Sequence, residues 1–172
     1  NLKCAFLDFI MPLITVLGDA GIFWITAAVV LLLIPKQRKA GLSMGIALLI
    51  GLVVCNMILK PWVGRIRPYD YQLEHFGKTI ELLVATPHDY SFPSGHTIAS
   101  FEAAVALTVH NRKLGIPAMI LAVLIAFSRM YLYVHYPTDV LASVVLGTAI
   151  AFLGCFIAKK LFALLEAKRK TA

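Results

Sequence analysis

The chain has few acidic residues and few cysteines. Nine of its 172 residues are Asp or Glu, against 16 Lys and Arg, and charged residues make up only 15% of the sequence. The three cysteines, Cys4, Cys55 and Cys155, share no metal-like spacing, and the last two lie inside apolar segments. This scarcity argues against a disulfide framework and against a site built from clustered carboxylate, His or Cys ligands. We therefore expect no metal and no cofactor.

The sequence also shows no internal repeat, no low-complexity segment and no cleavable signal peptide, since no cationic start leads into a short apolar run. Apolar residues, by contrast, are abundant: the chain is 60% hydrophobic, with a mean hydropathy of +0.83. Soluble domains are closer to half apolar, and repeated apolar windows of about 18 residues are typical of membrane helices. Residues 1–172 are therefore predicted to form one membrane-embedded domain.

Glycine, proline and basic residues divide the apolar sequence into five predicted transmembrane spans. The spans are expected at residues 21–34, 41–59, 94–110, 116–134 and 140–162. Residues 1–17 are short and amphipathic, with Pro12 inside, and are predicted to form a helix in the membrane interface. The polar stretch 61–92, weakly helical near 71–84, is expected to be a loop that covers the substrate side. The predicted fold class is an all-α helical bundle of about five spans plus the interfacial helix.

Basic residues gather on one side of this predicted bundle. The loop at 36–39, the loop at 111–113 and the C-terminal tail hold three, two and five of the 16 Lys and Arg. Because basic loops stay in the cytoplasm, the C-terminus is expected there, in a multi-pass plasma-membrane protein whose opposite loops are extracytoplasmic. The net charge of +7 is then explained by topology, so nucleic acid is not an expected partner.

Three short motifs fall at span ends on the predicted extracytoplasmic side. Their patterns are KxxxxxxRP from Lys60 to Pro68, PSGH from Pro93 to His96, and SRxxxxxHxxxD from Ser128 to Asp139. In the second motif, Ser94 is a good helix N-cap and Gly95 lets a ligand approach the backbone closely. The free N–H groups and positive dipole end of a helix suit a phosphate.

The cations of the motifs suit the same ligand. Lys60, Arg67 and Arg129 supply three positive charges, and guanidinium groups can bind phosphate oxygens in pairs. The Ser94 side chain and the backbone N–H groups that begin at Gly95 would complete the phosphate-binding set. One such cation alone would ordinarily be a snorkelling side chain at a helix end. Three of them at this spacing favour a functional site.

Together the motifs resemble the signature of the type 2 phosphatidic acid phosphatase superfamily, over roughly residues 45–150. The resemblance implies that His135 attacks phosphorus and forms a phosphohistidine. Asp139 would hold the His135 imidazole in the reactive tautomer and stabilise its cation. His96 would act as the general acid that protonates the leaving oxygen. The implied reaction is metal-independent hydrolysis of a membrane lipid phosphate or diphosphate.

Small bacterial-looking members of this family commonly act on undecaprenyl diphosphate, which implies the same substrate here and a part in recycling the cell-wall carrier lipid. Phosphatidylglycerophosphate or phosphatidate phosphatases and lipid phosphotransferases would share every motif. A non-catalytic lipid binder or transporter remains a further alternative, although the intact His96, His135 and Asp139 count against it. Vanadate-dependent haloperoxidases share the signature but are soluble and much longer. Arg65 or Lys78 is expected to hold a second phosphate.

Four positions outside the motifs are also informative. Asp19 is expected to be a helix-end or loop residue beside the glycine break. Glu102, two turns into the third span, is expected either to be paired within the bundle or to stand behind the site. The pair His88 and Asp89 fits a solvated loop better than the rim of a site. Trp24 is expected in an interfacial aromatic belt.

Overall fold

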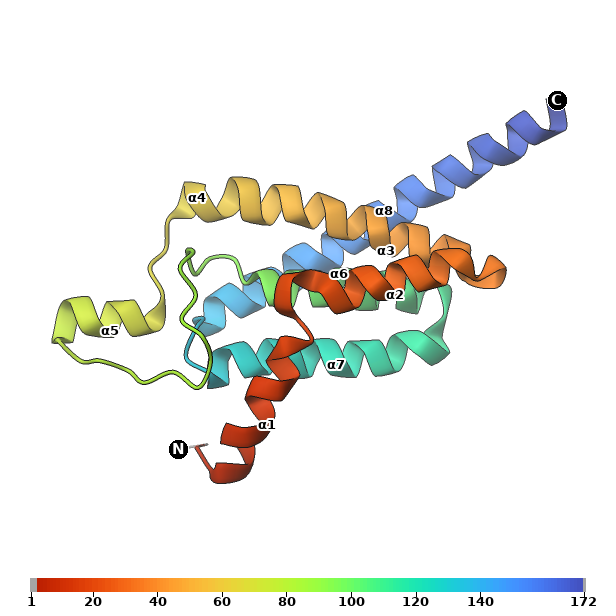
Figure 1. Ribbon diagram of the computed structural model, residues 1–172. Helices are drawn as coiled ribbons and strands as arrows, with labels where there is room; N and C mark the ends of the chain where they lie inside the picture. The colour runs from red at the N-terminus through yellow and green to blue at the C-terminus, as the bar shows by residue number, and fades with distance from the viewer. Residues whose placement is uncertain (1–2, 172) are drawn as a thin grey trace.

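The computed structural model describes residues 3–171, with side chains for residues 3–168, and every regular element in this range is helical (Figure 1). The elements are α1 (Ala5–Val16), η1 (Asp19–Gly21), α2 (Ile22–Leu33), η2 (Pro35–Gln37), α3 (Arg38–Gly51), η3 (Leu52–Leu59), α4 (Lys60–Val63), α5 (Pro68–Phe76), α6 (Gly95–His110), α7 (Arg112–Tyr131) and α8 (Pro137–Thr171). The all-α prediction is confirmed. Within residues 3–171, four helical stretches are long and apolar enough to cross a membrane: Ala5–Leu33, Pro35–Phe76, Arg112–Tyr131 and Pro137–Lys168. The expected count of about five spans is not confirmed, because α6, the expected third span, has only 16 residues.

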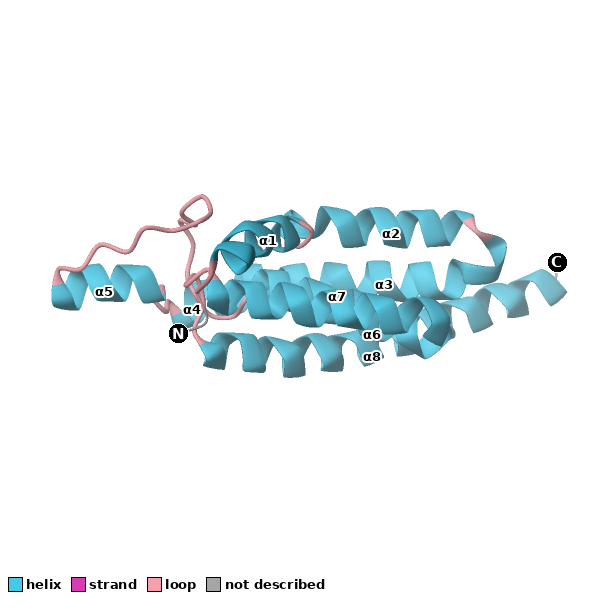
Figure 2. Ribbon diagram, turned by 90° about the horizontal axis from the view of Figure 1, so that it is seen from below, coloured by secondary structure: helices cyan, strands magenta, loops and turns pink. Residues whose placement is uncertain are grey.

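The central element is α6, which packs on α3, α7 and α8 (Figures 1 and 2). Small residues allow this close packing. A Cβ on Gly147 of α8 would lie 2.9 Å from the Ile98 carbonyl oxygen, and one on Gly115 of α7 would lie 2.3 Å from Thr108. Such contacts between small residues replace the hydrophobic effect where helices meet inside lipid. Because α6 is surrounded by other helices, its N-terminus is held firmly at one end of the bundle.

Trp24 takes part in this core, so its predicted place in an interfacial belt is wrong. The side chain is only 2% exposed, and its indole nitrogen donates to Ser100 Oγ on α6 over 3.0 Å. A buried Trp ordinarily finds such a hydrogen-bond partner for its N–H group.

The first membrane stretch is broken in the middle, as its glycines predicted. α1 and α2 have 12 residues each, about 18 Å apiece, so neither alone crosses a hydrocarbon core of about 30 Å. The break is η1, where Ala20 has φ 49° and Gly21 has φ 67°. The interfacial position expected for residues 1–17 stays a prediction, and the first two of these residues lie outside the described range.

Several helix boundaries differ from those expected, α8 for example running over Pro137–Thr171 rather than 140–162, and two of the differences have clear local reasons. α7 begins at Arg112 rather than near 116, because Asn111 Oδ1 accepts from the backbone N–H groups of Lys113 and Leu114. Pro117 consequently lies inside α7 rather than in its first turn. The helix within the polar stretch is α5, at residues 68–76 rather than 71–84, because proline favours the start of a helix and Gly77, with φ 59°, ends it.

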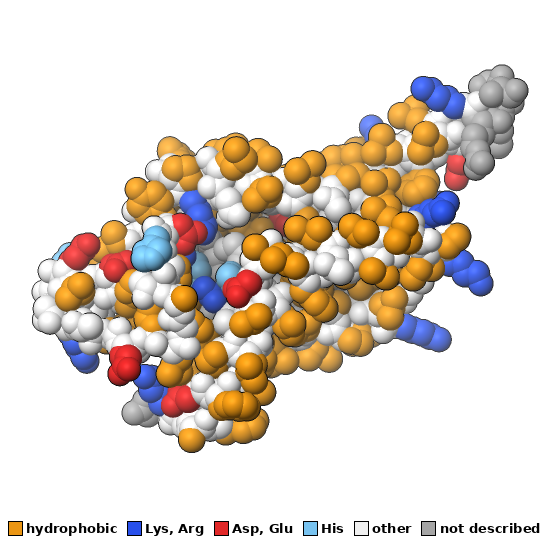
Figure 3. Space-filling view, in the orientation of Figure 1, with side chains coloured by type: hydrophobic (Ala, Val, Ile, Leu, Met, Phe, Trp, Pro, Cys, Tyr) orange, Lys and Arg blue, Asp and Glu red, His pale blue; other side chains and the backbone are white. Residues whose placement is uncertain are grey.

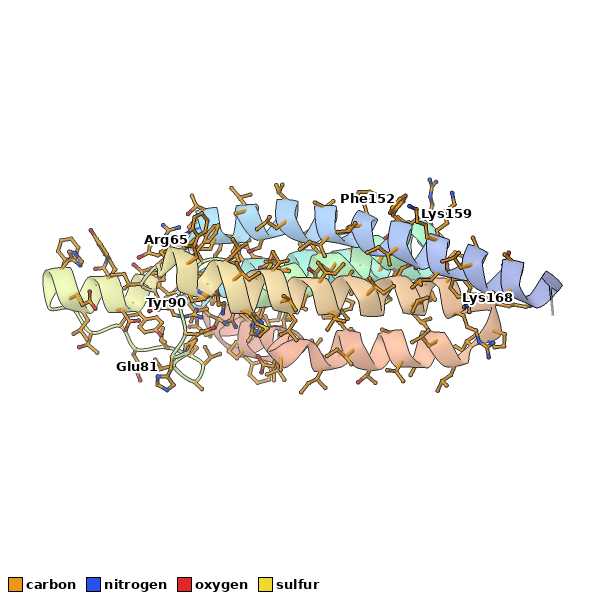
Figure 4. All side chains as sticks on the ribbon, turned by 90° about the horizontal axis from the view of Figure 1, so that it is seen from above. Arg65, Glu81, Tyr90, Phe152, Lys159 and Lys168 are labelled. Atoms are coloured by element: carbon orange, nitrogen blue, oxygen red, sulfur yellow. The ribbon has the colours of Figure 1, made fainter. Side chains whose placement is uncertain are left out.

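α2 and α3 form a wedge that opens toward the end of the bundle carrying α4. Near their connection they touch closely, since a Cβ on Gly41 would lie 2.5 Å from the Leu32 nitrogen. One turn further along α3, Gly45 has nothing within 4 Å of the same position. Figure 4 shows Arg65, Glu81 and Tyr90 at the open end, and Lys159 and Lys168 toward the other. The motif residues and the basic tail therefore lie at opposite ends of the molecule.

Candidate active site

A cavity of about 1050 Å³ fills the open end of this wedge. Its polar end is lined by Lys60, Arg67, Asp89, His96, Arg129 and His135. Figure 3 shows charged and imidazole side chains gathered around the hollow. Its apolar part continues between α2 and α3, where Ile25, Val29, Leu49 and Leu52 line it while remaining about half exposed on the outer surface. The fold thus brings the three motifs together above an apolar groove that opens sideways.

Three cations face the polar end, as predicted. Arg67, the N-cap residue of α5, is 3% exposed, and its Nη1 donates to the Val134 carbonyl oxygen over 2.7 Å. Arg129, near the end of α7, donates from Nη1 to Thr15 Oγ1 over 2.6 Å. Its Nε has no hydrogen-bond partner among the described residues, although it is buried. A buried guanidinium nitrogen without a partner is well suited to receive an anionic oxygen.

His135 follows α7 in a tight turn that includes Tyr133 with φ 60°. Its Nε2 lies 3.2 Å from Arg67 Nη1, so this nitrogen faces the cations. Burial lowers the pKa of His135 to about 4; nearby Asp139 opposes this shift, and the charges of Arg67 and Arg129 add to it. The imidazole is consequently neutral at physiological pH, which is the state a nucleophile needs.

Asp139 stands behind His135, outside the cavity. Its Oδ2 lies 3.6 Å from His135 Nδ1, longer than a hydrogen bond, and Nδ1 has no partner in the described part of the chain. The carboxylate instead accepts from Ser91 Oγ at 2.5 Å, Arg65 Nη1 at 2.6 Å and the Tyr136 backbone nitrogen at 3.0 Å. Asp139 thus lies beside His135, but the hydrogen bond expected to orient the imidazole is not formed; a shift of about 0.5 Å would close it.

The PSGH motif forms the N-terminus of α6, as predicted. Ser94 is the N-cap, and its Oγ accepts from both the backbone nitrogen and the hydroxyl of Thr97. The Ser94 side chain is fully buried and engaged, so a contact with phosphate would require this cap to open. Gly95 lines the cavity, and a Cβ there would lie 3.3 Å from Asn56 Oδ1. The backbone N–H groups of Gly95 and His96 thus remain for an anion.

The His96 side chain forms a hydrogen bond with Asp19, a residue outside the three motifs. Asp19 Oδ1, in η1, lies 2.7 Å from His96 Nε2, which corrects the expectation that Asp19 is merely a helix-end residue. Gly18 makes the approach possible, since a Cβ there would lie 2.6 Å from His96 Cδ2. The glycines on either side of Asp19 indicate a bend in the chain at this point, but nothing in the sequence indicates that the bend contacts α6.

Asp89 also reaches the site, contrary to the solvated-loop interpretation. Its carboxylate forms ion pairs with both Lys60 and Arg67. Burial alone would raise the pKa of Asp89, but hydrogen bonds and charge from these two cations outweigh it and bring the pKa to about 2. The carboxylate is therefore ionised, and it occupies the cations that were expected to hold phosphate.

Glu102 lines the main cavity, whereas Arg65 and Lys78 do not. Glu102 is 1% exposed and lines the cavity against Gly51, and its Oε1 has no partner in the described range. It therefore stands behind the site rather than in an ion pair. Arg65 is bound to Asp139, and Lys78 lines a separate cavity of about 310 Å³, so neither lines the main cavity. The expectation that one of them holds a second phosphate has no support in these positions.

Comparison with known proteins agrees with the geometry. The sequence profile of the PAP2 superfamily matches residues 38–162. The chain belongs to the PAP2 superfamily. It is 36% identical to an undecaprenyl-diphosphatase of Sulfolobus acidocaldarius over 131 residues, which are 76% of this chain and 61% of that protein. It is 35% identical to the undecaprenyl-diphosphatase BcrC of Bacillus subtilis, over 86% of this chain and 72% of that one.

A solved PAP2 structure supports the same fold. The crystal structure of a transmembrane phosphatidylglycerolphosphate phosphatase of the PAP2 type from Bacillus subtilis superposes with a TM-score of 0.70 at 27% identity. The likeness covers 92% of this chain and 80% of that one, so it extends beyond residues 38–162, the range that matches the PAP2 profile. The resemblance drawn from the three motifs is therefore confirmed at the level of the family.

Proposed function

We propose that this PAP2 protein is a metal-independent lipid phosphatase that acts through a phosphohistidine on His135 and dephosphorylates undecaprenyl diphosphate. The observation that carries the proposal is the position of His135 Nε2, which faces the buried Arg67 at 3.2 Å inside a cavity continuous with an apolar groove. Two relatives that carry the name undecaprenyl-diphosphatase support the substrate.

The first chemical step transfers the phosphoryl group to His135. Lys60, Arg67 and Arg129 bind its oxygens, together with the N–H groups at the start of α6. The lone pair of Nε2 attacks phosphorus, a P–N bond forms, and the bond to the leaving oxygen breaks. His96 gives its proton to that oxygen. Asp139 stabilises the positive charge that His135 acquires.

The second step returns the enzyme to its starting state. His96, now neutral, removes a proton from water, and the resulting hydroxide attacks phosphorus as the P–N bond breaks. Inorganic phosphate and neutral His135 are the products. In a lipid phosphotransferase the hydroxyl group of a lipid would take the place of this water.

The groove beneath the cations fits a long apolar tail. The stretch from Lys60 down to Gly45 is about 20 Å long at the helical rise per residue. Gly45 lines its deep end and leaves open space there. A tail of this length lies between α2 and α3, and the remainder continues into the bilayer.

The charge distribution supports an extracytoplasmic site. The loops near residue 37 and residue 112 hold Lys36, Arg38, Arg112 and Lys113, at the end opposite the cavity. Under the positive-inside rule that end is cytoplasmic. The head group would then enter from the outer leaflet, where a diphosphate carrier lipid is released.

Hydrolysis of a defined panel tests the proposal. Purified protein is assayed with undecaprenyl diphosphate, phosphatidylglycerophosphate and phosphatidate, with and without EDTA, because the solved relative makes phosphatidylglycerophosphate the second candidate. Activity is expected to survive EDTA and to be highest on the diphosphate. Single turnover should trap phosphate on His135, and His135→Ala should lose both trapping and turnover. Full activity of His135→Ala would end the mechanism, and a lipid-binding protein without turnover would favour the non-enzymatic alternative.

A further inference from the structure

The N-terminal segment supplies a second carboxylate–histidine pair to the cavity. His135 and Asp139 form the first pair, within one motif. The second joins His96 of α6 to Asp19 of η1 over 2.7 Å, across 77 residues of sequence. Asp19 lies outside residues 38–162, so the PAP2 profile does not include it. Asp19 and His96 both line the cavity.

The position of Asp19 is built by several independent contacts. Gly18 brings the backbone within van der Waals distance of the His96 ring, where no side chain would fit. Ala20 adopts φ 49°, a conformation that costs free energy for a residue other than glycine and that turns the chain at this point. Just before the turn, Thr15 is 3% exposed and bound to Arg129. The end of α1, just before Asp19, is thus fixed to the site through Thr15 and Gly18.

The charges around His96 show what Asp19 contributes. Burial is the largest influence and lowers the pKa of His96 to about 4; the cations Arg129 from α7 and Lys60 from α4 face the imidazole and add to this shift. Asp19 from η1 is the anion that faces the imidazole and favours its protonated form. A general acid has to carry its proton when the substrate arrives, in a site that is positively charged because it binds phosphate. Asp19 opposes the loss of this proton, and the negative charge of the arriving phosphate opposes it further; without Asp19 the protonated form would be still less favourable.

We propose that Asp19 is the positioning residue of the general acid: it accepts a hydrogen bond from His96 Nε2 and so leaves Nδ1 as the nitrogen that donates to the leaving oxygen. This inference rests on the proposed role of His96. In the first step the proton moves from Nδ1 to the leaving oxygen as the P–O bond breaks, and Asp19 keeps its hydrogen bond to Nε2–H. In the second step Nδ1 takes a proton from water.

The proposal predicts a dependence on the leaving group. Phosphatidate releases an alkoxide, which is as basic as hydroxide and requires protonation, whereas a polyprenyl diphosphate releases a phosphate whose pKa is about 6. Loss of the Asp19 carboxylate should therefore lower kcat more for phosphatidate, the monophosphate, than for the diphosphate. A change that merely loosened the fold would lower the two rates equally.

The experiment measures kcat and KM of the full-length protein in detergent with phosphatidate and with farnesyl diphosphate. Asp19→Asn should lower kcat on phosphatidate about 10- to 100-fold with little change in KM, and on farnesyl diphosphate by less than about threefold. His96→Ala should lower kcat on phosphatidate by about 100-fold or more. The double variant should match His96→Ala alone, because Asp19 acts through His96.

Asp8→Asn is the matched control, on the preceding helix α1. Asp8 accepts from the Tyr131 hydroxyl over 2.6 Å, away from His96, so this variant should keep the wild-type ratio of the two rates. Equal losses of Asp19→Asn on both substrates, or a further loss in the double variant, would overturn the positioning role while leaving the proposed function intact. An unchanged kcat in His96→Ala would overturn both the role of His96 and the inference built on it.

Discussion

Replacing Asp89 with asparagine should make the site bind phosphate more tightly. In the structure the Asp89 carboxylate pairs with Lys60 and Arg67, two of the cations assigned to the substrate phosphate. A phosphate that enters must displace this carboxylate from both. Asp89→Asn keeps the shape of the side chain but removes its negative charge, so the competition is reduced and the cations become more attractive to an anion.

The size of the effect follows from the ion pairs. Moving the pKa of Asp89 from 3.8 to about 2 corresponds to roughly 2 to 3 kcal/mol of net interaction with its surroundings. The side chain is 53% exposed, so solvent screening reduces this to about 1 kcal/mol. A free-energy change of that size is about fivefold in a dissociation constant. The tighter phosphate binding of Asp89→Asn relative to the wild type should be present at neutral pH. It should disappear as the pH falls through about 2, where the Asp89 carboxylate of the wild type itself becomes neutral.

The assay is competitive inhibition of lipid hydrolysis by inorganic phosphate or vanadate at neutral pH. The inhibition constant of Asp89→Asn should fall about fivefold. Glu81→Gln is a suitable control, because Glu81 belongs to the same loop but lines the separate small cavity. An inhibition constant that stays the same or rises in Asp89→Asn would show that the carboxylate does not compete with the ligand.

Three further predictions concern the pH dependence of catalysis, the path of the lipid tail and the orientation of the protein in the membrane. Because the pKa of His135 is about 4, kcat/KM should fall below that pH as the imidazole becomes protonated, rather than near 6.5, as a pH–rate profile would show. Gly45→Leu fills open space in the groove, so KM for undecaprenyl diphosphate should rise about tenfold while farnesyl diphosphate is unaffected; equal effects on both would contradict the assigned path of the tail. In a Cys4→Ser background, Glu74→Cys should react with an impermeant maleimide in intact cells and Gln37→Cys should not, and the reverse labelling would invert the proposed topology.

The sequence predicted that the three motifs lie at one end of the bundle, because each motif is attached to a helix end. Capping chemistry at Ser94 sets the start of α6, and the turn after α7 brings His135 back toward it. Apolar spans of similar length then bring these ends to one level. The positions of Lys60, Arg67, Arg129 and His135 around one cavity follow from such local rules.

Asp19 and Asp89 could not be predicted in the same way. Asp19 reaches His96 through a bend with positive φ at Ala20, and no residue pattern specifies the direction of such a bend. Asp89 lies in an irregular stretch without periodicity, so the sequence does not indicate which way its carboxylate points. The interfacial position predicted for Trp24 rests on the usual preference of Trp for the membrane interface, whereas its side chain is in fact held in the core by one tertiary partner, Ser100.

The sideways opening of the groove determines which part of the lipid supplies the binding free energy and which substrate concentration governs the rate. Val29 and Leu49 line the cavity and also belong to the half-exposed outer surface of the helices. A tail that slides in from the bilayer exchanges one apolar environment for another, so its burial contributes little binding free energy. The head group must then supply most of the affinity. The relevant concentration is the two-dimensional density of substrate among its neighbours in the leaflet, and diluting it with inert lipid should slow turnover even when the bulk amount is unchanged.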